Sequence, residues 1–452
     1  MFQRVLVANR GEIAVRVIRA LRELGVESVA VYSTADAGAL HVRLADRAVR
    51  VGPPPAGASY LNVPSIVAAA KTTGCEAVHP GYGFLAENRA FVHACEENEL
   101  VFVGPDADVM ARMGDKSQAK AEMAAAGVPL VPGSPGRVSF EQAQVVAAEL
   151  GFPVLLKASA GGGGRGMRLV EAPDELADAY GQAASEAQAA FGDGSLYVEK
   201  AVSPARHVEI QVLCDAEGNV LTLGERECSI QRRHQKLIEE SPSPALDAGT
   251  REEMEACVER ACRAIGYRNA GTVEFLLGPD GSYYFIELNA RLQVEHPVTE
   301  VVTGIDLVRE QLRIAAGERL RLTGRAPRAG HALEIRINAE DPARGFAPSP
   351  GAIERWRPPL GPGVRVDTFV EEGTLISPYY DSLIAKVVVQ DESRAAAIER
   401  ALRALGELEV RGVPTTREVA IEIISSAEFR SGDYSTGFLE EAGARLPALA
   451  GR

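Results

Sequence analysis

The sequence has few of the residues that mark zinc-binding or disulfide-stabilised proteins. It contains one tryptophan, six cysteines and seven histidines among 452 residues, and no two cysteines form a CxxC pair. Neither residue type follows a zinc-ligand spacing. We therefore predict a reduced, cytoplasmic protein. Cys228 lies inside a polar, partly basic segment described below, and we expect its thiol to pack rather than react.

Long apolar runs and an excess of positive charge are also lacking. No apolar run approaches 18 residues, and the first residues are charged too early for a signal peptide, so they indicate a first strand. The 48 basic and 62 acidic side chains give a net charge of -14. This balance disfavours non-specific binding to nucleic acids or anionic membranes, and we expect neither as a partner.

The order of apolar segments predicts several α/β domains. A chain of 452 residues is long enough for two to four domains. Strand, helix and strand patterns over 4–8, 12–24 and 29–32 predict a βαβ unit and hence a parallel sheet. A second region begins near Gly114, and its expected strands are 154–157, 167–170, 196–199, 207–213, 220–225, 271–277 and 283–287. From about Gly330, short strands and helices near 394–407 and 416–425 are expected.

The segment 285–297 carries the most chemical information. Every second residue is polar, which is typical of an extended chain with one buried face: Glu287, Asn289, Arg291, Gln293 and Glu295. A single strand of this length would keep its ends roughly 26 Å apart. We therefore predict a strand that ends near Asn289, followed by an extended loop whose carboxylate, amide and guanidinium groups bind ligands.

A second carboxylate is expected beside Glu287. Glu274 lies on the preceding strand, and a turn over 278–281 connects the two segments. Antiparallel pairing would place both carboxylates side by side, where they would repel each other without a cation. Two carboxylates together with nucleotide phosphates are a typical magnesium site.

The glycine-rich segment 157–167 predicts a phosphate-binding loop. It formally contains GxGxxG, but a strand follows instead of the helix that a dinucleotide site requires, and the sequence has no GxxxxGK[ST] motif. The alternatives are a merely flexible hairpin and a mobile loop whose backbone N–H groups approach phosphate oxygens. Four consecutive glycines are entropically costly, which favours the second.

Two further polar segments leave alternatives open. The segment 231–236, QRRHQK, is either a solvated basic patch or a cationic pocket for phosphate or a small anion, and its acidic surroundings favour the pocket. Glu199 ends a strand and either contributes to an adenine-binding edge or forms a surface charge pair with Lys200.

Taken together, eight segments resemble the biotin carboxylases, which are ATP-grasp enzymes, over residues 1–446. They are 8–14, 79–88, 113–116, 157–167, 207–211, 231–236, 287–300 and 334–342. The resemblance implies an α/β chain with an N-terminal Rossmann-like parallel-sheet domain over 1–113 and an ATP-grasp domain over 114–329. The ATP-grasp domain would carry a mobile glycine-rich lid over about 132–204. A C-terminal mixed α+β domain would follow over 330–446.

The resemblance also implies a reaction. Bicarbonate attacks the γ-phosphate of ATP to give carboxyphosphate and ADP, and the carbon dioxide released from carboxyphosphate is captured by a ureido nitrogen of biotin. ATP and Mg²⁺ or Mn²⁺ are the implied cofactors, and biotin is a carrier-bound substrate. The implied partners are a biotin carboxyl carrier protein, a carboxyltransferase and a second copy of the chain. The sequence contains no biotinyl-lysine motif, so carrier and transferase are expected on separate chains.

Site residues are implied by the same motifs. Contacts to ATP are implied for Lys116, Lys157, Gly163, Gly164, Glu199, Lys200, Ala201, Val202, His207, Gln231 and His234. Metal binding is implied for Glu274, Glu287 and Asn289, and bicarbonate binding for Lys236, Arg291, Gln293 and Val294. Glu295 is the implied general base, Arg336 would stabilise charge on biotin and phosphate, and Tyr82 would line the biotin pocket.

Two other functions fit the sequence less well. Another ATP-grasp ligase, for carbamoyl phosphate or an amino acid, is disfavoured by the segments QVEHPVTE and QRRHQK. An inactive nucleotide-sensing subunit would have lost a metal carboxylate, Lys236 or Arg291, and all of these are present. The sequence does not indicate the final acceptor, whether an acyl-CoA such as acetyl-CoA or propionyl-CoA, or a 2-oxo acid.

Overall fold

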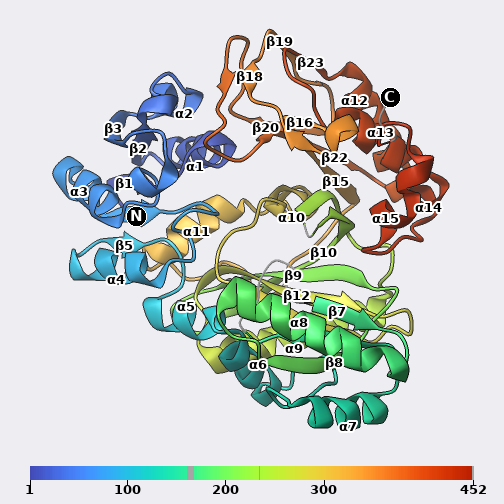
Figure 1. The fold of residues 1–452 in the computed structure, drawn as a ribbon. Helices are drawn as coiled ribbons and strands as arrows, with labels where there is room; N and C mark the ends of the chain where they lie inside the picture. The colour runs from blue at the N-terminus through green and yellow to red at the C-terminus, as the bar shows by residue number, and fades with distance from the viewer. Residues whose placement is uncertain (160–166, 234, 450–452) are drawn as a thin grey trace.

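The computed structural model describes residues 1–159, 167–233 and 235–449. Figure 1 shows three groups of elements around a central sheet: the N-terminal elements in blue, a green and teal unit at the lower right, and the C-terminal elements in orange and red at the top. Among the described residues, no helix is both long and apolar enough to cross a lipid bilayer.

The N-terminal sheet is parallel, with the order β3-β2-β1-β4-β5, and confirms the expected Rossmann-like domain. Its strands are β1 (Arg4–Val7), β2 (Glu27–Ser33), β3 (Arg47–Gly52), β4 (Ala77–His79) and β5 (Val101–Phe102). The helices beside it are α1 (Gly11–Glu23), α2 (Leu40–Leu44), α3 (Val63–Thr73), α4 (Arg89–Glu97) and α5 (Ala107–Gly114). Side chains of Asn62, Asn88 and Asp106 accept backbone N–H groups and so begin three of these helices.

A smaller antiparallel sheet, β7-β6-β8, forms the unit that was expected as the lid. It consists of β6 (Val154–Ala158), β7 (Met167–Val170) and β8 (Leu196–Lys200), with α7 (Phe140–Leu150) and α8 (Leu176–Phe191) packed beside it. The apolar residues described for its two clusters all come from 138–198. This part of the chain therefore has a hydrophobic core of its own.

The central sheet runs in the order β13-β12-β9-β10-β11-β15-β22-β20, and β14 pairs with β10. Its strands are β9 (Arg206–Cys214), β10 (Val220–Arg232), β11 (Gln235–Ser241), β12 (Asn269–Leu277), β13 (Tyr283–Asn289), β14 (Gly324–Arg325), β15 (His331–Asn338), β20 (Val364–Thr368) and β22 (Leu383–Asp391). The associated helices are α6 (Lys116–Ala125), α9 (Ala248–Ile265), α10 (His296–Thr303) and α11 (Leu307–Ala315).

Shorter elements complete the C-terminal part. They are the strands β16 (Glu340–Asp341), β17 (Ala347–Pro348), β18 (Gly351–Ala352), β19 (Arg355–Arg357), β21 (Leu375–Ile376) and β23 (Glu409–Arg411), and the helices α12 (Arg394–Glu407), α13 (Arg417–Ser425), α14 (Ala427–Ser431) and α15 (Phe438–Ala442). Single-turn helices cover Thr34–Asp36, Ala56–Ala58, Pro173–Glu175, Pro342–Arg344 and Gly443–Arg445. Two of the expected helices, 394–407 and 416–425, are confirmed by α12 and α13.

The central sheet extends further than the sequence pattern indicated. The strand expected over 220–225 continues to Arg232 as β10, and β11 pairs it with β15. The strands β3 and β11 were not expected, because charged residues interrupt their apolar pattern. Since the sheet passes from β11 to β15 without a break, the domain boundary at 329/330 stays a prediction.

One glycine at this junction is required by its surroundings. Gly330 has φ +72°, and a Cβ atom there would lie 2.3 Å from the carbonyl oxygen of Asp391. Gly218 also has a positive φ, +81°, but nothing lies within 4 Å of its Cβ position. An alanine would therefore meet backbone strain at both positions but steric overlap only at residue 330.

We predict that Gly330→Ala lowers stability by more than Gly218→Ala. The left-handed conformation costs alanine roughly 1–2 kcal/mol at either position, and the clash at Gly330 adds about 1–3 kcal/mol. Differential scanning calorimetry of the two variants measures this difference. Equal melting temperatures would contradict the close approach of residue 330 to β22.

Candidate active site

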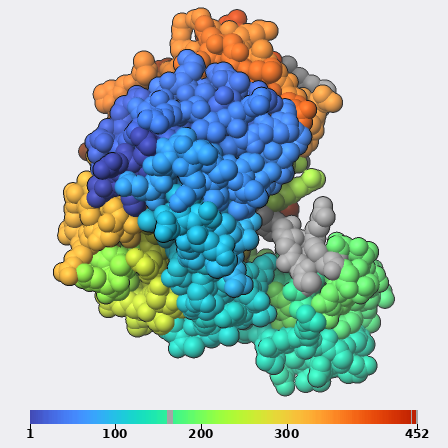
Figure 2. All heavy atoms as spheres, turned by 90° about the vertical axis from the view of Figure 1, so that its left-hand side faces the viewer, coloured from blue at the N-terminus to red at the C-terminus, as the bar shows by residue number. Residues whose placement is uncertain are grey.

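A cavity of about 1760 Å³ lies between the N-terminal sheet, the β6–β8 unit and the central sheet. Figure 2 shows the surface hollowed between the blue N-terminal part and the green part. The predicted site residues that line this cavity are Tyr82, Lys116, Lys157, His207, Gln231, Lys236, Glu274, Glu287, Asn289, Arg291, Gln293, Val294, Glu295 and Arg336. The chain therefore brings together side chains that lie far apart in sequence.

The ammonium group of Lys236 is shared by three carboxylates. Its Nζ donates to Glu209 Oε2 at 2.6 Å, Glu274 Oε1 at 3.2 Å and Glu295 Oε1 at 2.5 Å. Burial alone would lower the pKa of Lys236, but these carboxylates raise it well above its ordinary value. The lysine is therefore charged.

Glu295 is held as a carboxylate in the same cluster. Its other oxygen accepts from Arg336 Nη2 at 2.9 Å. Burial would raise the pKa of Glu295, but Lys236, Arg336 and Arg226 hold it well below its ordinary value. A buried carboxylate with two cationic partners is poised to interact with a further charged or acidic group.

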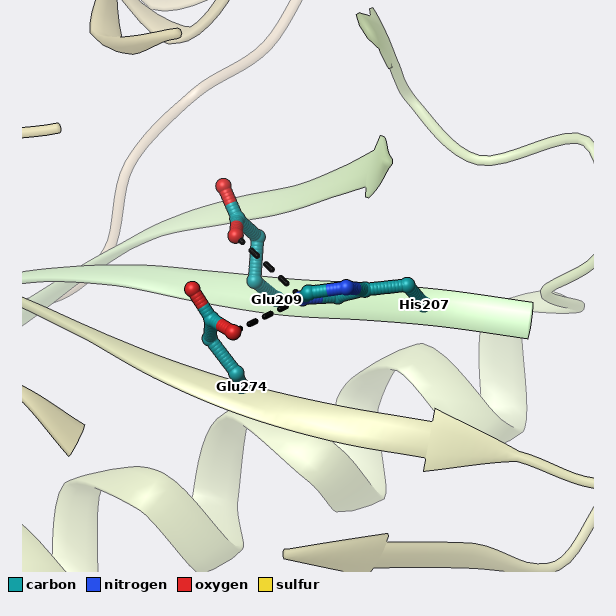
Figure 3. Close-up of side chains that lie close together, drawn as sticks. All are labelled: His207, Glu209 and Glu274. Atoms are coloured by element: carbon teal, nitrogen blue, oxygen red, sulfur yellow. Dashed lines mark ion pairs between the residues drawn. The ribbon is translucent and has the colours of Figure 1, made fainter. Parts of the chain in front are cut away.

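The carboxylates of Glu209 and Glu274 also meet His207. His207 Nε2 lies 2.9 Å from Glu274 Oε2 and 3.8 Å from Glu209 Oε2. Figure 3 shows the three side chains, two from β9 and one from β12, pointing toward one another. Possible ligand atoms of this trio lie within 4.8 Å of one another, so the trio has metal-ligand spacing that the sequence analysis did not single out.

The expected carboxylate pair is also present. Glu274 on β12 lies directly opposite Glu287 on β13, which confirms the predicted pairing of these strands. Asn289 Nδ2 donates to Glu274 Oε1 at 2.9 Å and to Glu287 Oε1 at 3.4 Å. Two carboxylates and one amide supply the oxygen ligands that Mg²⁺ prefers, provided that the amide turns its oxygen toward the ion.

The predicted strand end is confirmed, since β13 ends at Asn289 and α10 begins at His296, but the loop between them bends at 290–291 and turns at 294–295 instead of staying extended. Within it, Arg291 Nε donates to Glu87 Oε2 at 2.8 Å, and the backbone N–H of Ala290 donates to Glu87 Oε1 at 3.2 Å. Glu87 thus orients Arg291. Glu87 lies in the segment 79–88, one of the eight segments named above, but the sequence alone predicted no role for it.

Arg226 is a second residue that sequence reasoning missed. Its guanidinium is fully buried. Within the part of the chain that the structure describes, it donates to five side chains, of which Gln293 lines the cavity: Glu209 (2.5 Å), Gln211 (2.7 Å), Gln293 (2.7 Å), Thr299 (3.0 Å) and Thr272 (3.1 Å). Gln293 in turn donates from Nε2 to Glu274 Oε1 at 2.6 Å. Arg226 therefore fixes both a carboxylate of the Lys236 cluster and the amide of the loop.

At the opposite end of the cavity, lysines gather around Glu199. Lys157 and Lys120 each donate to one of its oxygens at 2.5 Å, and the Lys120 ammonium lies 5.0 Å from the ring centre of Tyr197. Glu199 therefore pairs with Lys157, which lines the cavity, and with Lys120 rather than with Lys200, although Glu199 is not itself one of the cavity-lining residues. Lys120 was not among the predicted residues.

Several predicted residues lie off the cavity or outside the described structure. The Lys200 ammonium donates to the carbonyl groups of Gly151 and Phe152, and Ala201 and Val202 are half-buried. The predicted phosphate-binding Gly163 and Gly164, and also His234, lie outside the described residues. The assignments of all these residues stay predictions.

The cysteines fit the expected packing role. All six are buried with free thiols. Burial raises the pKa of Cys228 well above its ordinary value, and the nearby Glu209 adds to this shift. A thiol held in the neutral form is a poor nucleophile, which supports packing as its role.

Comparisons with known proteins agree along the whole chain. Residues 1–110 match the family described as "Biotin carboxylase, N-terminal domain", residues 115–323 "Carbamoyl-phosphate synthase L chain, ATP binding domain", and residues 334–441 "Biotin carboxylase C-terminal domain". The biotin carboxylase of Nostoc sp. is 53% identical over 97% of this chain and 99% of its own length. The 2-oxoglutarate carboxylase small subunit of Hydrogenobacter thermophilus is 51% identical over 98% of this chain and 94% of its own length.

A solved structure agrees as well. The biotin carboxylase domain dimer of Hydrogenobacter thermophilus 2-oxoglutarate carboxylase, in complex with MgADP, ADP and bicarbonate, has a TM-score of 0.90 and 50% identity. The match covers 98% of each chain.

One buried carboxyl group near the cavity should titrate near neutral pH. Burial raises the pKa of Glu239 to about 7, although Arg336 Nε, which donates to it at 2.6 Å, opposes the shift. The native state thus binds this proton more tightly than the unfolded chain, so stability falls as pH rises from about 4.5 to 7. We therefore predict that the free energy of unfolding of Glu239→Gln, taken relative to that of the unmodified protein, rises by about 1–3 kcal/mol from pH 5 to pH 8.

Calorimetric melting temperatures at the two pH values measure this gain. Glu240→Gln is the matched control, because the pKa of Glu240 is shifted in the opposite direction. Burial alone would raise it, but hydrogen bonds from His331 and Arg394 lower it below its ordinary value. Its contribution to stability is lost only as pH falls through that lowered pKa, so this variant should be less stable by a similar amount at both pH values. A constant offset for Glu239→Gln would contradict the shifted pKa.

Proposed function

Because this chain belongs to the biotin carboxylase family, we propose that its cavity joins ATP, bicarbonate and biotin in a single site, with the residue roles given below. The family reaction is the ATP-dependent carboxylation of biotin by bicarbonate, which releases ADP and phosphate. The contacts of Lys236 support this proposal most directly. They place a cation, an ionised carboxylate and Arg336 at one point of the cavity.

The nucleotide occupies the end of the cavity that carries the lysines. Lys116 and Lys157 line it and bind the phosphates, while Glu199 holds the Lys157 ammonium in place. Phosphoryl transfer depends on such positioning and charge neutralisation more than on covalent chemistry. The further contacts assigned to ATP are those of Gly163, Gly164, Glu199, Lys200, Ala201, Val202, His207, Gln231 and His234.

Glu274, Glu287 and Asn289 would hold a divalent ion. Their oxygens suit Mg²⁺ or Mn²⁺, and the Lys236 ammonium, 3.2 Å from Glu274, supplies positive charge to the same carboxylate. When bound, the ion would neutralise charge on the phosphate oxygens of ATP.

Bicarbonate binds where Lys236 and the loop meet. Lys236, Arg291, the Gln293 side chain and the Val294 backbone supply donors to its oxygens. An anion at this point competes with Glu295 for Lys236 and places a like charge beside the carboxylate, so the pKa of Glu295 rises on binding. Glu295 then takes the bicarbonate proton, and the freed oxygen attacks the γ-phosphorus to form carboxyphosphate and release ADP.

Biotin binds at the side of the cavity formed by Tyr82 and Arg336. Carboxyphosphate divides into carbon dioxide and phosphate, and the phosphate removes the ureido proton of biotin. The Arg336 guanidinium, also bonded to Glu239 and Glu295, stabilises the negative charge that develops on the ureido oxygen. The ureido nitrogen then bonds to carbon dioxide, and the proton that Glu295 took from bicarbonate passes to solvent, which restores the carboxylate.

The partners follow from this half-reaction. We propose a biotin carboxyl carrier protein as the biotin donor, a carboxyltransferase as the next enzyme, and a homodimer, as in the H. thermophilus structure. The six buried free thiols support a cytoplasmic location. Relatives named for pyruvate and 2-oxoglutarate carboxylases match about as well as one named only biotin carboxylase, so this chain does not identify the acceptor. The domain boundaries at 113/114 and 329/330 are part of the proposal.

A coupled assay for ADP release tests the function. With ATP, magnesium, bicarbonate and free biotin, the purified protein should release ADP, and release should fall to background when bicarbonate is removed. Biotin-stimulated turnover that persists in bicarbonate-free buffer would contradict the mechanism.

Glu295→Gln provides the residue-level control for the same assay. The amide preserves size but cannot take a proton, so the bicarbonate-dependent rate should fall roughly 10²- to 10⁴-fold. ATP affinity, measured by calorimetry, should stay near that of the unmodified protein. Arg291→Ala should instead raise KM for bicarbonate as well as slow turnover. A Glu295→Gln variant with near-normal turnover would assign the proton transfer to another group.

A further inference from the structure

Behind the bicarbonate loop lies a buried lysine with no role in the mechanism above. Lys386 is on β22, and its side chain is 0% exposed. Its ammonium lies 3.0 Å from Glu12 Oε1 and donates to the carbonyl oxygen of Val294 at 3.0 Å. One buried cation thus connects the C-terminal part of the sheet to the N-terminal helix α1 and to the loop that precedes α10.

The partner of this lysine also reaches the biotin side of the cavity. Glu12 Oε1 accepts the hydroxyl hydrogen of Tyr82, and the Lys386 ammonium lies 5.8 Å from the Tyr82 ring centre. Glu12 Oε2 has no hydrogen-bond partner within the part of the chain that the structure describes. All of the hydrogen bonds recorded for this carboxylate therefore go through the oxygen that joins Tyr82 to Lys386.

The charges around Lys386 keep it protonated. Glu334 faces it from β15 and Asp367 from β20, where Asp367 is its cross-strand neighbour. Arg336 on β15 lies directly opposite Lys386 on β22. Burial would lower the pKa of Lys386, but Glu12, Glu334 and Asp367 raise it above its ordinary value. The protonated ammonium donates to the Val294 carbonyl. Burial also raises the pKa of Glu12, although Lys386 opposes this shift.

The Val294 carbonyl group is coupled to the orientation of Glu295. It belongs to the peptide group that joins Val294 to Glu295, and a peptide group is planar. A donor that fixes the carbonyl direction fixes the N–H and the Cα position of Glu295 as well. The bond from Lys386 therefore determines the direction from which the Glu295 side chain enters the cluster around Lys236.

A buried ion pair is rarely needed for stability alone. Apolar side chains of similar volume often replace such a pair without loss, whereas removal of one partner leaves an uncompensated charge. Each member of this pair contacts a group beside a proposed substrate. Lys386 bonds to the peptide before Glu295, and Glu12 accepts from the hydroxyl of Tyr82.

We propose that Lys386 and Glu12 form a positioning pair that aligns Glu295 for bicarbonate and Tyr82 for biotin. The pair touches no reacting atom. It acts through the Val294–Glu295 peptide on one side and through the Tyr82 hydroxyl on the other, and so couples the order of the bicarbonate loop to that of the biotin pocket. This inference rests on the proposed function for the identity of the two substrates.

Lys386→Met tests the pair, together with the double variant Glu12→Gln/Lys386→Met, which removes both charges of the pair and so does not leave Glu12 as a buried carboxylate without its cation. In both variants KM for bicarbonate should rise and kcat should fall, each by roughly tenfold or more, as expected for a displaced catalytic group. The dissociation constant of ATP, measured by calorimetry, should change less than twofold. Amide hydrogen exchange in a peptide covering 288–298 should become faster.

Arg394→Met is the matched control. Arg394 bonds to Glu240, which is also a fully buried carboxylate, but neither residue lines the cavity. This variant should lose thermal stability with KM for bicarbonate and exchange in 288–298 unchanged. Glu12→Gln alone keeps acceptors for Lys386 and Tyr82 and should have a smaller effect than Lys386→Met.

The readouts separate this inference from the proposed function. Unchanged exchange in 288–298 in the double variant overturns the inference, whether or not the protein is active. If the unmodified protein shows no bicarbonate-dependent turnover, the proposed function is wrong. Amide hydrogen exchange in 288–298 then still tests the positioning pair. A parallel loss of ATP affinity in both variants would mean that the pair is purely structural and would also overturn the inference.

Discussion

The Lys236 ammonium shared by Glu209, Glu274 and Glu295 is the interaction on which the rest of the site depends. Three carboxylates this close together would repel one another and take up protons if the cation were absent. In surroundings with little water, each charge also acts on its neighbours more strongly than it would in solution. The cluster thus keeps a cation and an ionised carboxylate at the same point.

The central sheet makes this concentration of charge possible. Successive strands place polar side chains on the face toward the cavity, while clusters of apolar residues pack elsewhere against the same strands. The loss of hydration is offset where a charged group has partners. The Arg226 guanidinium bonds to five side chains, and Lys386 bonds to Glu12 and a carbonyl group. Rigid strands hold these groups more precisely than loops would.

The sequence predicted the parts of the site that depend on local pattern. The alternation through 285–297 predicted a strand ending at Asn289, and the short turn before it predicted that Glu274 and Glu287 would be opposite each other. Glu87 and Arg226 were missed because their roles depend on partners that are distant in sequence. The bond from Arg291 to Glu87 spans 204 residues. A pattern within one sequence does not indicate a contact between residues so far apart. The charged strands β3 and β11 were missed because pairing with neighbouring strands, and not a periodic apolar pattern of their own, defines them.

We propose that this cluster of charges turns bicarbonate into a nucleophile toward ATP. Bicarbonate labelled with ¹⁸O, supplied with ATP, magnesium and biotin, tests it through mass spectrometry of the released phosphate. If a bicarbonate oxygen attacks the γ-phosphorus, that oxygen stays on phosphorus when carboxyphosphate divides. Each phosphate formed together with carboxybiotin should therefore carry one labelled oxygen. Phosphate that carries no label, formed at the same rate as carboxybiotin, would contradict it.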